Sequence, residues 1–372
     1  MTAAPLPVMI AIGQLGRGGA ERQIHELVSR LDRSRFRITV VTFEPGGHYQ
    51  PLLEAAGAEV IVLDKRGAGE LTVVPRMAGL MRRRGIRAAH AFLFPASWRA
   101  VAAARLAGVR GVACAVRSTG VWMNRRHRMM DKAALRRARV VVANAPAVKR
   151  DILERTGMPS DRVRVIFNGV DAEVFHPGAS PLRPEWLAGE AGPPVNLVGF
   201  VGSLRAAKDP DLFVRIAATV SRRIPTARFV ITGGGPLRAE LEQRAASLGL
   251  ANGRLRFMGE RGDIPDVLRA LDLLVVSSVR EGCCNVILEA MSSGIPVVAT
   301  RVGGNPDLVE EGRSGWLFPY GDEAAGAERV AGLLADPEEA RRMGRQALEQ
   351  AGRYSTTTMV SQTCALYEEL AE

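Results

Sequence analysis

Long apolar runs and metal-binding patterns are what this sequence lacks. No apolar run approaches the roughly 20 residues that a membrane-spanning helix needs. The four cysteines form neither a Cys-x-x-Cys pair nor a cluster with the five histidines, which argues against a zinc or disulfide framework. They are Cys114, Cys283, Cys284 and Cys364. The first seven residues contain no basic segment of a secretory signal, so the cytosol is the expected compartment.

The charge that is present is distributed unevenly. The chain has 372 residues, of which 47% are hydrophobic and 24% charged, as in a soluble globular protein of about two domains. Residues 1–178 contain 29 Lys and Arg against 14 Asp and Glu, a net charge of +15, whereas the remainder has a net charge of −4. We therefore expect the first half to meet an anion: nucleic acid, a phospholipid surface or a phosphorylated acceptor.

Short apolar runs alternate with helix-length segments in both halves of the chain. Such runs are typical of parallel strands covered on both faces, so the pattern predicts an α/β fold with two doubly wound, Rossmann-like domains. The first half has runs at Val8–Ile12, Arg37–Phe43, Glu59–Leu63, Ala88–Phe94, Gly111–Arg117, Val140–Ala143 and Val163–Phe167. The second half has runs at Val195–Val201, Arg228–Thr232, Leu255–Met258, Leu271–Ser277, Pro296–Thr300 and Trp316–Phe318.

A stretch rich in proline and glycine separates the two sets of runs. We expect an N-terminal domain at 1–178, a linker at 179–194 and a C-terminal domain at 195–355. The last segment, 356–372, is predicted to form a helix that packs back on the N-terminal domain. Two such domains facing each other would place the carboxyl ends of their strands around a shared cleft, which is where open α/β sheets bind ligands.

The loop after the first predicted strand contains Gly18 and Gly19, and the residues that follow have helical period as far as Leu31. Glycine lets a ligand approach the backbone, and the free amides of a first helical turn favour an anion such as phosphate. A dinucleotide fingerprint would need a third glycine where Glu21 stands, so a nicotinamide enzyme is disfavoured. A tight turn that needs small residues explains the two glycines equally well.

The segment from Glu281 to Glu289 is the strongest candidate site. We expect Glu281 in the loop after a strand, Asn285 as the N-cap of the next helix, and Glu289 about one turn into that helix. Carboxylates pair well with adjacent hydroxyls, and the amides at the helix start would meet phosphate. This combination fits a sugar nucleotide. The alternative for Glu289, a surface carboxylate, is weakened by its apolar neighbours.

Six segments, in chain order, resemble motifs of one known family. They are Gly18–Arg22, Asn168–Asp171, Phe200–Lys208, Gly233–Leu237, Met258–Gly259 and Glu281–Glu289. They are similar to motifs of the retaining glycosyltransferases of the GT-B fold, in family 4. The resemblance implies transfer of a sugar from a nucleoside-diphosphate donor to an acceptor hydroxyl, in the synthesis of cell-surface polysaccharide, lipid-linked glycan or another glycoconjugate. It implies no cofactor besides the sugar nucleotide as co-substrate.

The resemblance also implies roles for single residues. Glu281 would contact the donor sugar, Glu289 the ribose hydroxyls, and Lys208 the leaving diphosphate. Ser203 stands where the family usually has an arginine, so we expect Arg205 to supply the second cation. The further donor-side residues are Gly18, Gly19, Gly202, Asp263, Gly282, Cys283, Cys284, Asn285 and Val286.

Cations would stabilise the charge that develops on the leaving group, and no metal is expected. The triplet Asp209-Pro210-Asp211 resembles a metal-binding pattern, but an aspartate followed by proline is an ordinary helix start. On the acceptor side the family often has two histidines after its fourth strand, of which only His90 is present here. His90 and Arg117 are the acceptor-side candidates, with His90 a candidate for catalysis. A lone histidine in a strand is more often a core residue.

Two basic stretches, 81–84 and 125–139, contain methionine among their cations, and Trp122 precedes the second stretch. Such a surface can lie on anionic lipid, so we expect peripheral contact with the inner face of the membrane. A solvated helix face is the alternative.

Two rival functions stay open. One is a GT-B sugar-nucleotide epimerase or phosphorylase, and the other is a basic protein that binds nucleic acid. The second lacks aromatic residues interleaved with its cations, so we expect no specific nucleic acid partner.

Overall fold

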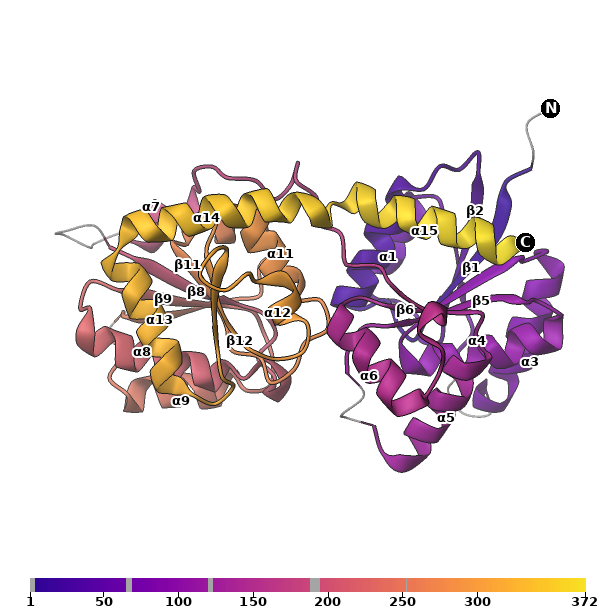
Figure 1. The fold of residues 1–372 in the computed structure, drawn as a ribbon, viewed down its shortest axis with the longest axis horizontal. Helices are drawn as coiled ribbons and strands as arrows, with labels where there is room; N and C mark the ends of the chain where they lie inside the picture. Colours follow the sequence, from indigo (N-terminus) through magenta and orange to yellow (C-terminus); the bar gives the residue numbers. More distant parts are fainter. Residues whose placement is uncertain (1–3, 65–68, 120–122, 188–194, 252) are drawn as a thin grey trace. The chain divides into compact units, whose positions relative to one another are not determined.

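The computed structural model describes residues 4–64, 69–119, 123–187, 195–251 and 253–372. The chain forms two compact units. The N-terminal unit comprises Met1–Gly169 together with Thr356–Glu372, and the C-terminal unit comprises Val170–Ser355 (Figure 1). Each unit contains one parallel sheet, which confirms the predicted α/β class with two doubly wound sheets.

The sheet of the N-terminal unit has the strand order β3-β2-β1-β4-β5-β6-β7. Every residue of β4 and β6 is buried, as expected for parallel strands with helices on both faces. The strands are β1 Leu6–Ile12, β2 Phe36–Thr42, β3 Glu59–Val62, β4 Ala88–Phe92, β5 Gly111–Val116, β6 Val140–Ala143 and β7 Val163–Val165.

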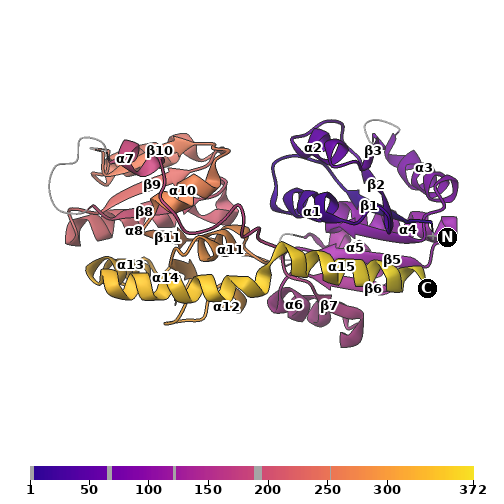
Figure 2. The ribbon, with the colours of Figure 1, turned by 90° about the horizontal axis from the view of Figure 1, so that it is seen from above.

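Two groups of helices cover this sheet. Helices α1, α2 and α15 cover one face of the sheet, and α3 to α6 cover the other (Figures 1 and 2). Apolar side chains of the first group form one core with their face, and those of the second group form a second core. The helices are α1 Gly19–Arg30, α2 Tyr49–Ala55, α3 Gly69–Arg83, α4 Leu93–Ala107, α5 Arg125–Arg137, α6 Pro146–Thr156, the 3-10 turn η2 Ser160–Arg162 and α15 Thr356–Ala371.

The sheet of the C-terminal unit has the order β10-β9-β8-β11-β12-β13. Its strands are β8 Leu197–Val201, β9 Arg228–Thr232, β10 Leu255–Gly259, β11 Leu273–Val276, β12 Val297–Thr300 and β13 Gly315–Phe318. The helices around it are α7 Leu182–Trp186, η3 Ala206–Lys208, α8 Pro210–Arg223, α9 Arg238–Ser247, α10 Ile264–Ala270, α11 Asn285–Ser292, α12 Asn305–Leu308, α13 Glu323–Ala335, α14 Pro337–Ala351 and η4 Gly352–Tyr354.

The segment 179–194, predicted as a linker, is partly built into the C-terminal unit. Ser180 Oγ donates to the carbonyl of Asp266 at 2.7 Å, and Arg183 pairs with Asp272 at 2.8 Å. Trp186 of α7 is 3% exposed. Residues 188–194 lie outside the described residues. Polar anchors therefore attach this Pro- and Gly-rich stretch to the C-terminal unit up to α7.

Several predicted strands are shorter in the structure, among them Ala88–Phe94, which loses two residues. β4 ends at Phe92 and α4 begins at Leu93, whose φ angle is +69°. A positive φ is incompatible with an extended strand, so the chain turns there although Leu93 and Phe94 are apolar.

The chain leaves the N-terminal unit at Gly169 and returns to it at Thr356. The side-chain amide of Gln23 in α1 donates to the carbonyl of Gly169 at 3.0 Å and accepts from its N–H at 2.8 Å. A Cβ atom on Gly169 would lie 2.6 Å from Cα of Thr356. Glycine is thus required where the two passages of the chain meet.

Candidate functional site

The strand order of the C-terminal unit marks one crevice. β8 and β11 are neighbours, but the strand after β8 lies on one side of the pair and the strand after β11 on the other. Loops leaving two such strands diverge, and open α/β sheets bind ligands between them. Lys208 ends the turn η3 after β8, and Glu281 lies in the loop after β11. The topology therefore places these two predicted site residues at the same crevice.

Lys208 and Glu281 form an ion pair there. Nζ of Lys208 lies 2.5 Å from Oε1 of Glu281, and Ser278 Oγ donates to the same oxygen at 2.6 Å. Burial lowers the pKa of Lys208, but Glu281 and Glu289 outweigh it, so the pKa lies above its ordinary value. The side chain of Lys208 is 32% exposed, so a permanent cation is available at the surface of this crevice.

A hydrogen-bond network fixes the backbone next to Lys208. Ser277 Oγ donates to the carbonyls of Asp209 at 2.7 Å and of Lys208 at 3.1 Å. Asp209 has a φ of +40°, a left-handed conformation that costs free energy in a non-glycine residue. Its Oδ1 accepts from the N–H of Leu212 and its Oδ2 from the hydroxyl of Tyr320. Asp209 is thus the N-cap of α8, as predicted.

The main chain at Glu281 is equally restricted. A Cβ atom on Gly303 would overlap the carbonyl oxygen of Glu281, and the N–H of Gly304 donates to that oxygen at 3.3 Å. Thr300 Oγ1 donates to the carbonyl of Ser278 at 2.7 Å. Residues after β12 therefore hold the loop after β11, and Glu281 keeps a fixed position beside Lys208.

The helix start after Glu281 differs from the prediction by one residue. Asn285 is the first residue of α11, and Cys284, with φ −77° and ψ 107°, stands at the N-cap position. An N-cap needs extended backbone, which Cys284 has and Asn285 does not, so Asn285 was wrongly predicted as the cap. No side-chain cap bond forms at Cys284. Glu289 lies on α11 and is 5% exposed, close enough to Lys208 to raise the pKa of that lysine.

The residues between Glu281 and α11 are buried. Gly282 is buried, and Cys283 and Cys284 are 6% and 2% exposed. Burial and the neighbouring Glu281 raise the pKa of the Cys284 thiol, so this sulfur stays protonated at neutral pH. Asn285 and Val286, at the start of α11, are half-buried.

The other predicted donor-side residues lie at carboxyl ends of neighbouring strands. Gly202 follows β8, where a Cβ atom on Gly233 would overlap its carbonyl oxygen. Arg205 precedes η3 and is exposed. Asp263 follows β10, two strands from β8, and Arg261 binds both of its oxygens, at 2.8 and 2.6 Å. That hydrogen bonding lowers the pKa of Asp263. The structure does not bring Asp263 to the Lys208 cluster.

In the N-terminal unit, the carboxylate of Glu21 lies at the start of α1. Gly18 is the N-cap and Gly19 the first residue of this helix. A Cβ atom on Gly18 would overlap Oε2 of Glu21, so the glycine leaves room for this carboxylate. Glu21 is 6% exposed, and burial raises its pKa although Arg117 acts in the opposite direction. The positive end of the helix dipole therefore has an acidic side chain of its own.

His90 lies within β4 and is 3% exposed. Its Nδ1 is 3.1 Å from the hydroxyl of Tyr367 in α15, and its ring centroid is 4.3 Å from that of Phe92. The guanidinium carbon of Arg117 lies 5.5 Å from the Phe92 ring. Burial, and secondarily Arg117, lowers the pKa of His90 to about 3, so the imidazole is neutral at physiological pH. His90 and Arg117 thus lie in one aromatic cluster.

Ser277, Ser278 and Tyr367 are among the contributors to these clusters that were not predicted as site residues. Ser277 and Ser278 end the β11 run and could be found there, since polar residues after a buried strand indicate a functional edge. Tyr367 follows His90 by 277 positions, and nothing local in the sequence pairs them.

Within the described ranges, no set of three or more His, Cys, Asp or Glu side chains is arranged to hold a metal ion. In the same residues, no helix combines the length and apolarity needed to cross a bilayer. Trp122, part of the basic region, lies outside the described residues.

Two family models match the chain in the expected order. Residues 17–174 match the model described as Glycosyltransferase Family 4, and residues 195–336 match that of Glycosyl transferases group 1. The chain belongs to glycosyltransferase family 4. Among relatives of this family-4 chain is a D-inositol 3-phosphate glycosyltransferase of Corynebacterium glutamicum, 33% identical over 252 residues. The match covers 65% of this chain and 60% of that relative's length.

Solved structures establish the fold of this family-4 chain as GT-B. Anabaena HepE in complex with UDP-glucose superposes with a TM-score of 0.86 at 24% identity, over 98% of this chain and 99% of that chain. Sucrose-phosphate synthase from Thermosynechococcus elongatus superposes with a TM-score of 0.81 at 21% identity, over 98% and 99%. The predicted GT-B architecture is confirmed.

Proposed function

We propose that this chain is a retaining glycosyltransferase that moves a sugar from a nucleoside-diphosphate donor to an acceptor hydroxyl. The observation that carries the proposal is the Lys208–Glu281 pair at the β8/β11 crevice. As the bond between sugar and diphosphate breaks, negative charge grows on the phosphate, and a fixed cation lowers that barrier. Lys208 has this role, and the exposed Arg205 is the second cation, so the reaction needs no metal.

The carboxylates divide the donor between them in this proposal. Glu281 accepts hydrogen bonds from the donor sugar, and Glu289 from the ribose hydroxyls. The first turn of α11 has no side-chain cap at Cys284, so its amides are the group that meets the diphosphate. The inositol phosphate specificity stated for the Corynebacterium relative and the UDP-glucose bound to HepE support a sugar-nucleotide donor and a hydroxyl acceptor.

We assign acceptor binding to the basic N-terminal unit. In this proposal Arg117 is the cation that contacts the acceptor, and the neutral His90 lies in the same aromatic cluster. A role in cell-surface polysaccharide or glycoconjugate synthesis, at the cytoplasmic side of an anionic membrane, completes the proposal.

Binding of sugar nucleotides tests the donor site. A ligand that binds only the folded state raises the melting temperature, so a panel of UDP-, GDP- and ADP-sugars identifies the donor. We expect Glu289→Gln to abolish the shift caused by that donor. Glu328→Gln, an exposed glutamate on α13, is the matched control and should leave the shift unchanged. An unchanged shift in Glu289→Gln, or no shift with any member of the panel, would overturn the proposal.

Product analysis tests the reaction. NMR of the glycosylated product should show the anomeric configuration of the donor. Inverted configuration contradicts retention. Isomerised nucleotide formed without acceptor would instead identify an epimerase, and a strict requirement for inorganic phosphate would identify a phosphorylase.

A further inference from the structure

The amino edge of the N-terminal sheet, opposite its carboxyl edge, is rich in arginine. The residue directly before each of β4, β5 and β6 is an arginine, and another ends η2 before β7. These four are Arg87, Arg110, Arg139 and Arg162. Neighbouring strands are about 4.8 Å apart, so the four backbone positions form a row about 15 Å long.

Some arginines at this edge have a structural role. Arg87 donates to the carbonyl of Ala371 at the end of α15, and Arg82 to that of Leu106 at the end of α4. Arg162 donates to the carbonyl of Ala138. The last carbonyls of a helix lack intrahelical partners, so these three cations stabilise helix ends. They explain part of the charge without any ligand.

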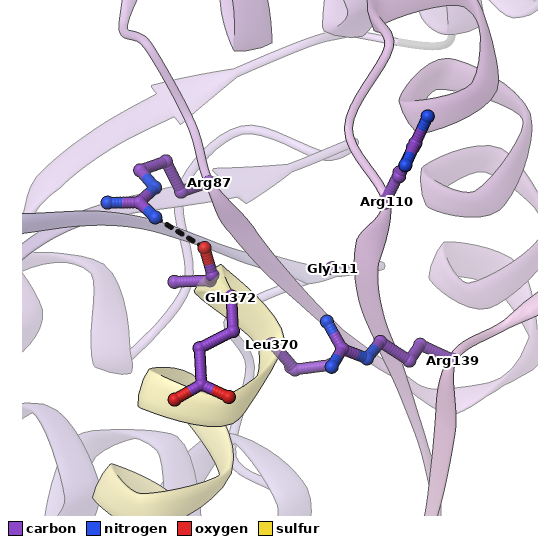
Figure 3. A pocket seen from close by; sticks show the side chains of 7 residues that line it. Arg87, Arg110, Gly111, Arg139, Leu370 and Glu372 are labelled. Atoms are coloured by element: carbon purple, nitrogen blue, oxygen red, sulfur yellow. Dashed lines mark hydrogen bonds between the residues drawn. The ribbon is translucent and has the colours of Figure 1, made fainter.

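Three arginines remain after this assignment. The side chains of Arg105, Arg110 and Arg139 are exposed and make no hydrogen bond or ion pair with any described residue. Figure 3 shows Arg87 bonded to the end of α15, whereas Arg110 and Arg139 extend from neighbouring strand entrances without such a bond. Holding unpaired cations together costs free energy through mutual repulsion, which an external anion relieves.

The cavities at this edge are basic. Arg110 and Arg139 line a cavity of about 430 Å³, and Arg105, Arg110 and Arg137 line a second one of about 400 Å³. Because Arg110 lines both, the two cavities adjoin. Of the residues that line them, Glu372 alone is acidic. The edge therefore presents two basic hollows that fit phosphate-bearing headgroups.

An exposed leucine favours a phospholipid surface over nucleic acid as the anionic partner of this edge. Leu106, next to Arg105 at the end of α4, is 55% exposed. A leucine among arginines can enter the acyl boundary of a bilayer, whereas nucleic acid would favour aromatic side chains for stacking. We propose that this edge, with Arg105, Leu106, Arg110 and Arg139 at its centre, docks on an anionic phospholipid surface. The inference deepens the proposed membrane contact and does not depend on the transferase reaction.

Vesicle sedimentation tests this surface without any catalytic readout. The full chain should bind vesicles of phosphatidylcholine mixed with phosphatidylglycerol, and not phosphatidylcholine alone. Arg110→Glu/Arg139→Glu should weaken binding by more than about thirty-fold, since each lost basic residue contributes roughly fivefold and the added glutamates are repelled by the anionic surface. Arg223→Glu/Arg345→Glu, an exposed pair in the C-terminal unit with the same change of charge, should alter binding less than about twofold.

A second pair separates this edge from the start of α5. Arg125→Glu/Arg126→Glu should change binding far less than Arg110→Glu/Arg139→Glu. An equal loss in both pairs would overturn the proposal, as would equal binding to both kinds of vesicle. Binding to duplex DNA would also overturn it if that binding is stronger than binding to vesicles and is lost in Arg110→Glu/Arg139→Glu. If Arg110→Glu/Arg139→Glu unfolds, Arg110→Gln/Arg139→Gln should still weaken vesicle binding about thirty-fold.

Retained sugar-nucleotide binding in the Arg110→Glu/Arg139→Glu variant keeps this test apart from that of the proposed function. Loss of vesicle binding with an unchanged thermal shift supports the docking surface. A failure of the donor assignment leaves the vesicle result unaffected.

Discussion

Two side-chain clusters, one around Lys208 in the C-terminal unit and one around His90 in the N-terminal unit, differ in whether their basic residue is charged. In the C-terminal unit, Lys208 remains charged because Glu281 lies beside it, and Lys208 stays partly exposed. In the N-terminal unit, His90 is buried between aromatic rings, and its pKa is lowered to about 3. One cluster thus keeps its lysine charged, whereas the other keeps its histidine neutral beside Arg117. We propose the first cluster, with its fixed cation, as the one that stabilises the leaving phosphate.

The largest expected effect comes from removing the cation. Lys208→Ala should lower turnover of the sugar nucleotide by about 10²- to 10³-fold, because one preorganised donor to a developing oxyanion contributes on that scale. Steady-state release of nucleoside diphosphate measures it. Lys132→Ala, an exposed lysine on α5, is the matched control and should retain turnover. Turnover of Lys208→Ala within a few-fold of the parent would remove the distinction between the two clusters.

The next effect concerns His90, which is neutral at physiological pH. Because the pKa of folded His90 is about 3 and that of an unfolded histidine is 6.5, the unfolded chain takes up a proton first as the pH falls. Stability from this residue is complete above pH 6.5 and is lost between pH 6.5 and 3. At about pH 5 the loss is about 2 kcal/mol relative to pH 8.

Urea unfolding of the parent and of His90→Gln at both pH values isolates that contribution. The variant has no titrating group at this position and keeps an acceptor for the hydroxyl of Tyr367. Its free energy of unfolding should therefore fall by about 2 kcal/mol less than that of the parent between the two pH values. Equal losses would mean that His90 takes up a proton in the folded protein, and the contrast between the clusters would disappear.

The smallest effect tests how the charged cluster is held. Ser277→Ala removes the hydrogen bonds to the carbonyls of Lys208 and Asp209 and should cost about 1 kcal/mol of unfolding free energy. Tyr320→Phe removes one bond from a side chain that is 46% exposed, so we expect less than about 0.5 kcal/mol. Urea midpoints compare the two variants. A larger cost for Tyr320→Phe would show that the network depends on Asp209 rather than on Ser277.

The parallel sheets and the start of α8 were accessible from the sequence because they depend on local patterns. Buried strands appear as continuous apolar runs, and Asp209 followed by Pro210 indicates that a helix begins there. The end of β4 was not accessible, since Leu93 is apolar and only its backbone angle ends the strand.

Side-chain partners that only the folded backbone brings together explain what the sequence did not predict at the site. Ser278 bonds Glu281 across one loop, but Tyr367 reaches His90 from another part of the chain. Arg261, two residues from Asp263, binds that carboxylate, a contact that depends on loop geometry rather than on residue type. Motifs give the chemistry of a residue, whereas its neighbours in space decide whether it stays charged.

The division of the N-terminal unit into two stretches of chain has a consequence for biosynthesis. Leu366, Tyr367 and Leu370 of α15 complete the core over β1, β4 and β5. A ribosome that has made residues 1–169 has therefore produced a sheet with part of one face uncovered. The C-terminal unit, made next, is continuous in sequence and can fold first. The N-terminal unit can therefore complete its core only after the C-terminal unit has been synthesised.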